Sequence, residues 1–196
     1  MINLFPFIIA LFLSHLTMSQ STAIPDVNFE QALIDLNIDS DGLNGSILNS
    51  DASIVTSLNV ENKNISDLSG IEAFESINYL KCSFNNLSLL NLSSNIQLEG
   101  ILANDNELIS IELDGILSLY SIQLQNNQLS SLDLSNHTNL YFLYCFTNNL
   151  TSLNISSNYS LVYLSCGENQ LTGVLDISKL WQLEFFACSK ESINQC

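Results

Sequence analysis

The sequence of 196 residues contains no arginine and only four lysines, against twenty aspartate and glutamate residues, so its formal net charge is −16. Nucleic acids and anionic lipid surfaces are themselves negatively charged and would repel such a chain. We therefore expect no nucleic-acid partner. A charge of this size favours solubility and attraction of cations.

Groups suited to catalysis are also scarce. Beyond the first 19 residues only one histidine is left, His137, and its sequence SNHTN is typical of a surface turn. The carboxylates do not recur as an inward-facing pair of the kind that acid/base chemistry needs. Neither a phosphate-binding loop nor a Gly-x-Ser-x-Gly turn is present. The sequence predicts a protein that is not an enzyme and that needs no catalytic cofactor.

Long apolar runs are missing except at the start. The run from Leu4 to Leu13 has the length of the apolar part of a signal peptide and is too short to cross a bilayer. We expect residues 1–19 to be a signal peptide, with cleavage after Ser19. The mature chain is then predicted to be secreted or held at the outer cell surface, without insertion into the membrane.

A repeat of 21 residues dominates the rest of the chain. Apolar residues and one asparagine recur at positions 1, 4, 6, 9, 11, 14 and 16 of each unit, and a 22-residue step leads to a last unit at Leu183. The preceding units begin at Ile77, Leu98, Leu119, Leu140 and Leu161. A fixed period in this range is typical of a solenoid, in which each turn buries its apolar side chains against its neighbours.

The positions inside the unit indicate the local structure. Positions 4 and 6 have the spacing of a strand with one buried face, and one such strand per turn builds a parallel sheet. Position 6 holds Cys82, Cys145, Cys166 or Cys188 in four units and Ala103 or Leu124 in two. A buried cysteine behaves as a small apolar residue. The five cysteines, an odd number without CxxC spacing, argue against a disulfide scaffold or a zinc site.

Position 9 carries an asparagine in five consecutive units: Asn85, Asn106, Asn127, Asn148 and Asn169. The chain bends here as it leaves the strand, and its backbone N–H and C=O groups have no ladder partner. A side-chain amide both donates and accepts, so it can satisfy them. We expect these asparagines to form a structural ladder.

The pattern LxxLxCxxNxLxxLxL resembles that of leucine-rich repeat proteins, and more narrowly the secreted repeat proteins of Bacteroidetes and flavobacteria. The residues that carry the likeness are YLSC at 163–166 and NQLT at 169–172, while the leading unit, VTSLNVENKNISDLSGIEAFESI, is similar to internalin-type repeats. The resemblance implies an α/β solenoid: a right-handed horseshoe with a parallel sheet on its concave face and irregular or short extended segments on its convex face. It also implies a cell-surface or secreted binding protein.

The segment before the repeats resembles the helical cap of such proteins. Its sequence is IPDVNFEQALIDLNIDSDG, in which Asp26 can N-cap a helix whose inward residues are Phe29, Ala32, Leu33 and Leu36. We expect a cap with a helix and an acidic loop over residues 20–53. About seven repeats follow over residues 54–196, the last one incomplete.

The acidic loop of the cap predicts a possible calcium site. Asp39, Asp41 and Asn44 precede Gly45, and Asp51 follows it, in the manner of the second half of a calcium loop. The alternative is an Asp/Asn/Gly turn that links the helix to the first strand. Structural calcium is the only cofactor that the sequence indicates.

Positions 3, 5 and 7 of the unit should face solvent on the concave sheet. Six aromatic residues stand there, mainly in the fourth to sixth units: Tyr79, Phe142, Tyr144, Phe146, Tyr163 and Phe185. An exposed aromatic patch is typical of a surface that binds protein or glycan. The sequence thus predicts a non-enzymatic module for protein or glycan binding and adhesion. The alternative is a structural spacer within a larger adhesin or secreted enzyme.

Overall fold

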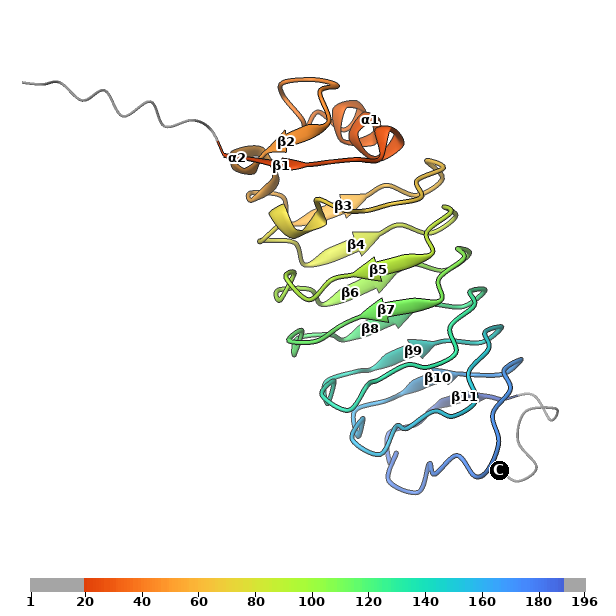
Figure 1. The fold of residues 1–196 in the computed structure, drawn as a ribbon. Helices are drawn as coiled ribbons and strands as arrows, with labels where there is room; N and C mark the ends of the chain where they lie inside the picture. Colours follow the sequence, from red (N-terminus) through yellow and green to blue (C-terminus); the bar gives the residue numbers. More distant parts are fainter. Residues whose placement is uncertain (1–19, 189–196) are drawn as a thin grey trace, which may run out of the picture.

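The computed structural model describes residues 20–188, which coil into a solenoid with one short strand per turn on the same side (Figure 1). These strands form a seven-stranded parallel sheet in the order β11-β10-β9-β8-β6-β4-β3. The predicted leucine-rich repeat solenoid is confirmed. The strands of this sheet are β3 (Ser57–Asn59), β4 (Tyr79–Lys81), β6 (Gly100–Leu102), β8 (Ser121–Gln123), β9 (Phe142–Tyr144), β10 (Tyr163–Ser165) and β11 (Phe185–Ala187).

The 21-residue period places equivalent residues of successive strands opposite each other. Leu143 of β9 is in register with Ile122 of β8 and with Leu164 of β10, and all three side chains are fully buried. The residues on either side of them point away from the core because side chains alternate along a strand. The sheet therefore presents two outward-facing columns, at positions 3 and 5 of the repeat.

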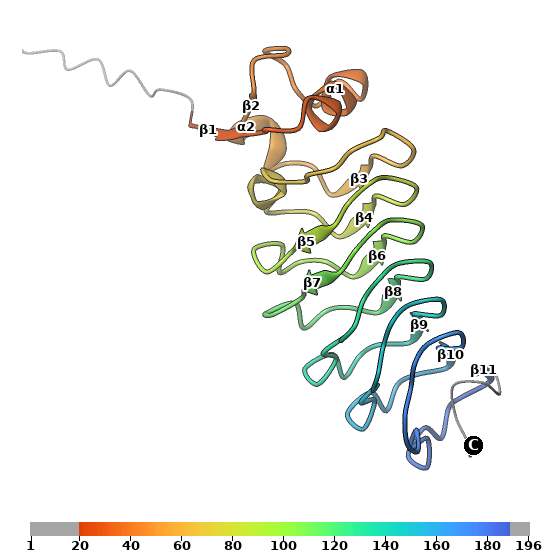
Figure 2. The ribbon, with the colours of Figure 1, turned by 45° about the vertical axis from the view of Figure 1, so that its right-hand side comes forward.

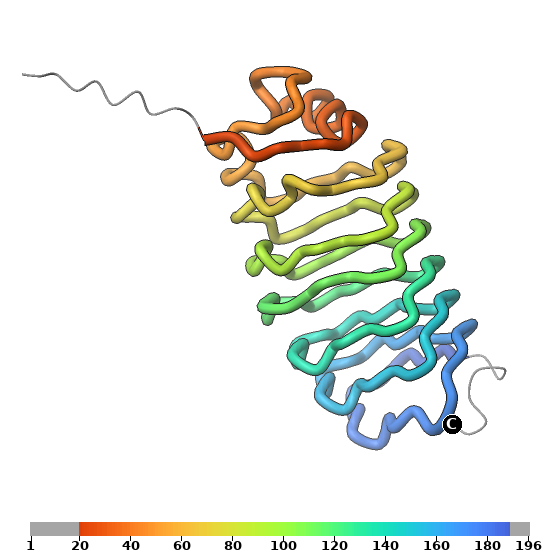
Figure 3. Tube along the Cα trace, viewed as in Figure 1, coloured from red at the N-terminus to blue at the C-terminus, as the bar shows by residue number. Residues whose placement is uncertain are grey.

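The opposite side of the coil is mostly irregular. It carries a two-stranded parallel sheet of β5 (Leu89–Asn91) and β7 (Ser110–Glu112), and a 3-10 helix, η1 (Ile71–Ala73), in the first turn. Figure 2 shows that the stack bends toward the seven-stranded sheet, so this sheet lies on the concave side. The tube in Figure 3 follows the successive turns down to the last described one.

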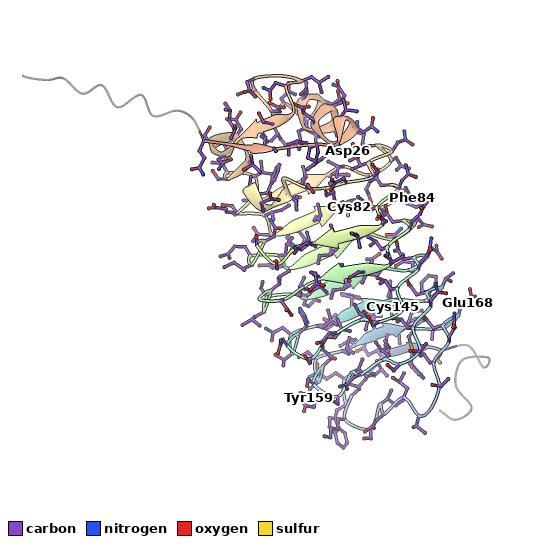
Figure 4. The ribbon with its side chains drawn as sticks, in the orientation of Figure 1. Asp26, Cys82, Phe84, Cys145, Tyr159 and Glu168 are labelled. Atoms are coloured by element: carbon purple, nitrogen blue, oxygen red, sulfur yellow. The ribbon has the colours of Figure 1, made fainter. Side chains whose placement is uncertain are left out.

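In the described turns the chain bends after the strand with a residue in the left-handed backbone region. In six turns this residue, at position 8, is not a glycine: Asn62, Phe84, Asp105, Asn126, Thr147 and Glu168 have φ between 51° and 58°. Figure 4 shows Phe84 and Glu168 on the same edge of the solenoid. Such backbone geometry is unfavourable for most non-glycine residues. Bonds formed elsewhere in the bend must offset this cost.

The cap covers the first turn and consists of β1 (Ser21–Ala23), α1 (Val27–Asp35), β2 (Ser46–Leu48) and α2 (Asn49–Ala52). The predicted N-cap is confirmed, since Oδ1 of Asp26 accepts hydrogen bonds from the N–H groups of Asn28 and Phe29. The helix buries Phe29 with its ring centroid 6.4 Å from that of Phe74 in the first turn. Leu36 was expected to face inward and is instead 42% exposed, because the helix ends at the preceding residue.

Asp26 also joins the cap to the repeats. Its Oδ2 accepts hydrogen bonds from the N–H and hydroxyl groups of Ser66 and from the N–H of Asp67. Figure 4 shows Asp26 at the boundary between α1 and the first turn. These bonds lower the pKa of Asp26 even though partial burial of the carboxylate opposes the shift. One carboxylate therefore terminates the helix and fixes its position on the solenoid.

Burial is complete inside the stack and weaker in the last turn. Leu161 and Leu164 are fully buried, while their counterparts one turn later, Leu183 and Phe186, are only partly buried. The cap shields the apolar side chains of the first turn, and no described residue does so for the last one. No helix within residues 20–188 is long and apolar enough to cross a membrane. The predicted signal peptide, residues 1–19, lies outside the described residues.

Candidate binding face

The concave sheet holds its outward side chains on a rigid backbone. Phe142 and Tyr144 flank the buried Leu143 in β9 and therefore project from the same face. Each strand pairs in parallel with the next, and the buried leucine or isoleucine of each strand lies opposite that of its neighbour. Side chains at the same position of successive strands then stand about 4.8 Å apart, close enough for aromatic rings to touch.

Five rings pack together on this face and form what we call the concave aromatic cluster. Its members are Tyr120, Tyr141, Phe142, Tyr163 and Phe185. Tyr120 stacks on Tyr141 with ring centroids 4.9 Å apart, and Phe142 stacks on Tyr163 at 4.6 Å. Tyr141 and Phe142 meet edge to face at 4.7 Å, which joins the two stacks. Phe185 extends the cluster at 6.4 Å from Tyr163.

The cluster is open to solvent along its length. Tyr120 and Phe185, at its two ends, are each 45% exposed, while the three central rings are half-buried by one another. Mutual packing orders the rings before any partner arrives. A partner would therefore lose little side-chain entropy on contact with them.

The predicted site residues divide between the cluster and its surroundings. Phe142, Tyr163 and Phe185 belong to it. Tyr144, at position 5, is the last residue of β9, and Phe146, at position 7, follows the strand. Both are half-buried, and no ring contact joins them to the cluster. Tyr79 lies apart on β4, where its hydroxyl donates to Glu99 at 2.9 Å.

Two members of the cluster were missed by the sequence reasoning. Tyr120 and Tyr141 occupy position 2, just before the strands, and only positions 3, 5 and 7 were taken as concave. The chain approaches the strand in an extended form, and the N–H of Tyr141 donates to the carbonyl of Tyr120 one turn earlier. Position 2 is therefore held next to position 3. The signal was present as Leu-Tyr at the start of two consecutive units.

Acidic groups accompany the rings. Glu99 and Glu184 stand at position 2 in other turns, the same column as Tyr120 and Tyr141. The hydrogen bond and the charge of Glu99 raise the pKa of Tyr79. Burial raises the pKa of Tyr141, with smaller effects of neighbouring tyrosines and of Glu184. Both shifts favour the neutral, hydrogen-bonding form of Tyr79 and Tyr141.

The five asparagines of position 9 lie at the bend after the strand. Asn148, in the middle, donates its amide hydrogens to the carbonyls of Leu124 and Cys145 at 2.9 and 3.2 Å. Its amide oxygen accepts from the N–H of Leu129 at 3.0 Å. These bonds reach the preceding turn as well as its own. The same geometry recurs at Asn85, Asn106, Asn127 and Asn169.

A second, unpredicted ladder runs along position 19. Asn95 donates to the carbonyls of Ile71 and Phe74, and Asn158 donates to those of Leu134 and His137, all in the preceding turn. Both asparagines are fully buried. The sequence interpretation treated this column as surface turn, since it contains no uniform residue type.

His137 belongs to the same column, so its assignment as a surface residue was wrong. Its side chain is 3% exposed, and neither ring nitrogen meets hydrogen-bond geometry with any partner in residues 20–188. Burial lowers its pKa, although the nearby carbonyls of Leu113 and Leu134 and the charges of Asp133 and Asp114 oppose the shift. An imidazole this deeply buried is out of reach of a substrate that approaches from solvent, so it is not placed to act as a general base.

Two buried thiols of position 6, those of Cys82 and Cys145, are also unsuited to nucleophilic chemistry. Burial raises the pKa of Cys82 to about 12 and that of Cys145 well above its usual value. Both side chains are fully buried. A nucleophilic cysteine needs a lowered pKa and access to solvent. These two residues fill space in the core.

The acidic loop of the cap is organised around a protein carboxylate. Oε1 of Glu30 accepts hydrogen bonds from the N–H groups of Asn44 and Gly45, both at 2.6 Å. Asp51 accepts from the N–H and hydroxyl of Ser40. The side-chain oxygen of Asn44 accepts from the hydroxyl of Ser46 at 2.7 Å. Asp39, a third predicted calcium ligand, accepts from the N–H of Asp41 at 3.2 Å, so three of the four have partners within the protein.

Asp39 and the fourth predicted ligand, Asp41, lie near each other. Burial and the proximity of Asp41 raise the pKa of Asp39, and one oxygen of this buried carboxylate lacks a partner. Among residues 20–188, no three histidine, cysteine, aspartate or glutamate side chains gather as a metal-binding group. The calcium site stays a prediction.

Several solved structures have a fold similar to that of this chain. Its structure is similar to that of InlF, an internalin of Listeria monocytogenes, with a TM-score of 0.74 and 21% sequence identity over 85% of this chain. It is also similar to the functional domain of InlJ from the same organism, which includes a cysteine ladder (TM-score 0.56, 22% identity, 87% of this chain). A third similar structure is a leucine-rich repeat protein of Leptospira interrogans (TM-score 0.60, 20% identity, 71% of this chain).

The shared fold is the leucine-rich repeat solenoid of internalins. The chain covers 52% of InlJ, 52% of InlF and 44% of the Leptospira protein, about half the length of each. No family model and no curated protein matches the sequence. These comparisons do not test the resemblance to Bacteroidetes repeat proteins that the repeat sequence indicates.

Proposed function

We propose that this protein is a non-enzymatic binding module that engages a protein partner through the concave aromatic cluster. The observation that carries the proposal is the packing of five rings from four successive turns on one rigid, partly exposed face. Large aromatic side chains dominate the energetics of protein interfaces, because each buries much area for little loss of entropy.

The rest of the molecule supports binding rather than catalysis. The thiols of Cys82 and Cys145 are buried with raised pKa values, and His137 is buried without hydrogen-bond partners among the described residues. The fold of the similar internalin structures is a platform whose outward side chains differ from protein to protein. The choice of ligand must therefore come from the aromatic cluster and its acidic neighbours.

The proposal extends to export and to the class of ligand. We propose that residues 1–19 direct secretion, and that the mature chain acts outside the cell or at its surface, in adhesion. Glycan is the second ligand class, since exposed aromatic rings also stack on sugars. N-terminal sequencing of the exported chain should return Gln20 as its first residue. An unprocessed Met1 on exported protein would contradict the signal peptide.

The test is a pair of protein and glycan arrays probed with the mature chain, residues 20–196. Tyr141→Ala and Tyr163→Ala each remove a central ring, and we expect each to weaken capture about 30-fold, corresponding to about 2 kcal/mol. Tyr159→Ala is the matched control, since this tyrosine is 50% exposed on the other edge of the solenoid (Figure 4).

The outcomes separate the candidate functions. Loss of capture in both cluster variants, with the control unchanged and with the circular dichroism of all three intact, supports the proposal. The type of array on which capture occurs decides between protein and glycan. Capture that survives both cluster substitutions would contradict a role for the cluster. Absence of any capture would favour the structural-spacer alternative.

A further inference from the structure

A groove on the convex side borders an unpaired strand edge. Strand β5 pairs only with β7 of the next turn, so its other edge has no strand partner within residues 20–188. The groove has a volume of about 680 Å³. It is lined on one side by residues 66–72 of the first turn and on the other by residues 88–91, which include β5.

The pairing pattern identifies the backbone groups that face the groove. The N–H of Leu92 donates to the carbonyl of Glu112 in β7, and this bond shows which residues of the strand direct their backbone groups toward β7. In a parallel ladder alternate residues turn their backbone groups to opposite sides. Leu90 therefore faces β7 along with Leu92, while Leu89 and Asn91 turn their N–H and C=O groups toward the groove.

The first turn packs closely against the cap and does not pair with β5. It closes through η1 instead of a strand, after a sharp bend at Gly70, whose φ is 103°. A side chain at Gly70 would collide with Ile24 and with the carbonyl of Ala23 in the cap. The first turn is thus held against the cap, and the N–H groups of Ser66 and Asp67 donate to Asp26 and not to β5.

The groove has an acidic character. Asp67 and Glu72 are exposed and line it, and no lysine is among its lining residues. Each carboxylate accepts a hydrogen bond from its own turn, Asp67 from Ser69 and Glu72 from Gly70, so both are held in place. Leu89, 60% exposed, adds apolar surface at the rim.

We propose that this groove binds an extended basic peptide segment of a partner protein, which adds to β5 as a third strand. The backbone of the peptide would pair with the N–H and C=O groups of Leu89 and Asn91. Its lysine or arginine side chains would lie against Asp67 and Glu72. Strand addition to an open sheet edge is a common mode of peptide recognition, and pairing through the backbone leaves the charges to select the peptide.

This site is separate from the concave aromatic cluster, so the two proposals can fail independently. The probe is a fluorescein-labelled hexapeptide of alternating lysine and valine with blocked ends, and the readout is fluorescence anisotropy with the mature chain. A glutamate/valine hexapeptide tests the charge requirement. A lysine/valine hexapeptide that is N-methylated at alternate residues lacks the N–H groups on one edge and tests strand pairing.

Three variants test the groove. Leu89→Pro removes the N–H of Leu89 and blocks the edge, whereas Leu89→Ala shortens the same side chain and keeps the N–H. The double substitution Asp67→Asn with Glu72→Gln removes the charges and keeps acceptor oxygens for Ser69 and Gly70. Glu107→Gln with Asp114→Asn is the matched charge control, because both acids are exposed and neither lines the groove.

We expect Leu89→Pro and the double groove variant each to weaken lysine/valine binding about tenfold or more, with Leu89→Ala and the charge control near wild type. Binding of the glutamate/valine and N-methylated probes should be weaker by a similar factor. Bound peptide should slow amide hydrogen exchange at Leu89 and Asn91 and leave that of Leu90 unchanged.

Several results would overturn the proposal. One is absence of saturable binding, and another is equal affinity of wild type and Leu89→Pro. Loss of binding in Tyr163→Ala would place the peptide on the concave face. If sedimentation shows a dimer of the free chain that Leu89→Pro dissociates, the edge belongs to a second copy of this protein and not to a basic peptide.

Discussion

The asparagine ladder offers a quantitative test through Asn148→Ala. In the structure the amide of Asn148 satisfies three buried backbone groups: the N–H of Leu129 and the carbonyls of Leu124 and Cys145. Alanine leaves the N–H of Leu129 without an acceptor in a region where the asparagine itself is only 6% exposed. The carbonyls of Leu124 and Cys145 each lose one bond and keep another, from Asn127 and Asn169 respectively. Water has little room to replace the amide there.

The expected cost follows from the number of groups left unsatisfied. A buried backbone group without a partner costs about 1–3 kcal/mol, and carbonyls tolerate the loss better than an N–H does. We expect the loss of the acceptor for one N–H, with a smaller contribution from the two weakened carbonyls, to lower the free energy of unfolding by about 2–4 kcal/mol. For a domain of this size the thermal midpoint should fall by about 4–16 °C. The positive φ of Thr147 at the same bend would lose its compensating bonds as well.

Urea unfolding followed by circular dichroism measures the change, with Asn149→Ala as the matched control. Asn149 is the next residue, is exposed, and makes only long side-chain bonds, including one of 3.4 Å to the carbonyl of Gln128. Its substitution should change the free energy of unfolding by less than about 0.5 kcal/mol. A loss below about 1 kcal/mol for Asn148→Ala, or equal losses for both variants, would refute the ladder as a source of stability.

Three further predictions concern the cap and the convex side. Burial lowers the pKa of His137, so the unfolded chain binds more protons than the folded one as the pH falls, and the thermal midpoint should fall between pH 7.5 and 5.5. The variant His137→Asn should remove that fall, because asparagine does not titrate and can donate to the carbonyls of Leu113 and Ile116, as Asn158 donates to the equivalent carbonyls one turn later. A His137→Asn variant with an unchanged pH profile would contradict this. Asp26→Ala should lower the free energy of unfolding by about 2–4 kcal/mol, because it leaves N–H groups of α1 and of residues 66–67 without acceptors. A loss of less than about 0.5 kcal/mol would show that Asp26 does not hold the cap on the repeats. If the cap loop binds calcium, millimolar calcium should raise the thermal midpoint in wild type and not in Asp39→Asn, whereas equal midpoints with and without calcium would rule out a stabilising site.

Much of the concave side could be predicted because it depends on contacts between equivalent positions. Once the period is 21, position 4 of each strand must meet position 4 of the next, as Leu143 meets Leu164. Local patterns were equally informative in the cap, where Asp26 precedes a helical apolar pattern and caps α1. Two of the five cluster rings escaped prediction because extended chain before a strand gives position 2 no fixed direction until the preceding turn is in place.

The repeat pattern did not predict which residues are buried on the convex side. His137 and Asn158 occupy equivalent places, yet the turn sequence around His137 is as polar as that of an exposed loop. Whether such a residue is buried depends on how the adjacent turns pack over it. The groove beside β5 has the same origin, because it lies where the first turn is held against the cap at Gly70.

By itself the sequence determined the solenoid, the alternation of buried and outward residues along each strand, and the helical cap, since each follows from periodicity and short-range capping chemistry. Only the tertiary structure decided which aromatic rings touch, which polar residues of the convex turns are buried, and where a strand edge stays open. Those features depend on how far one turn is shifted relative to the next, and that displacement is set by packing between turns, which no single repeat encodes.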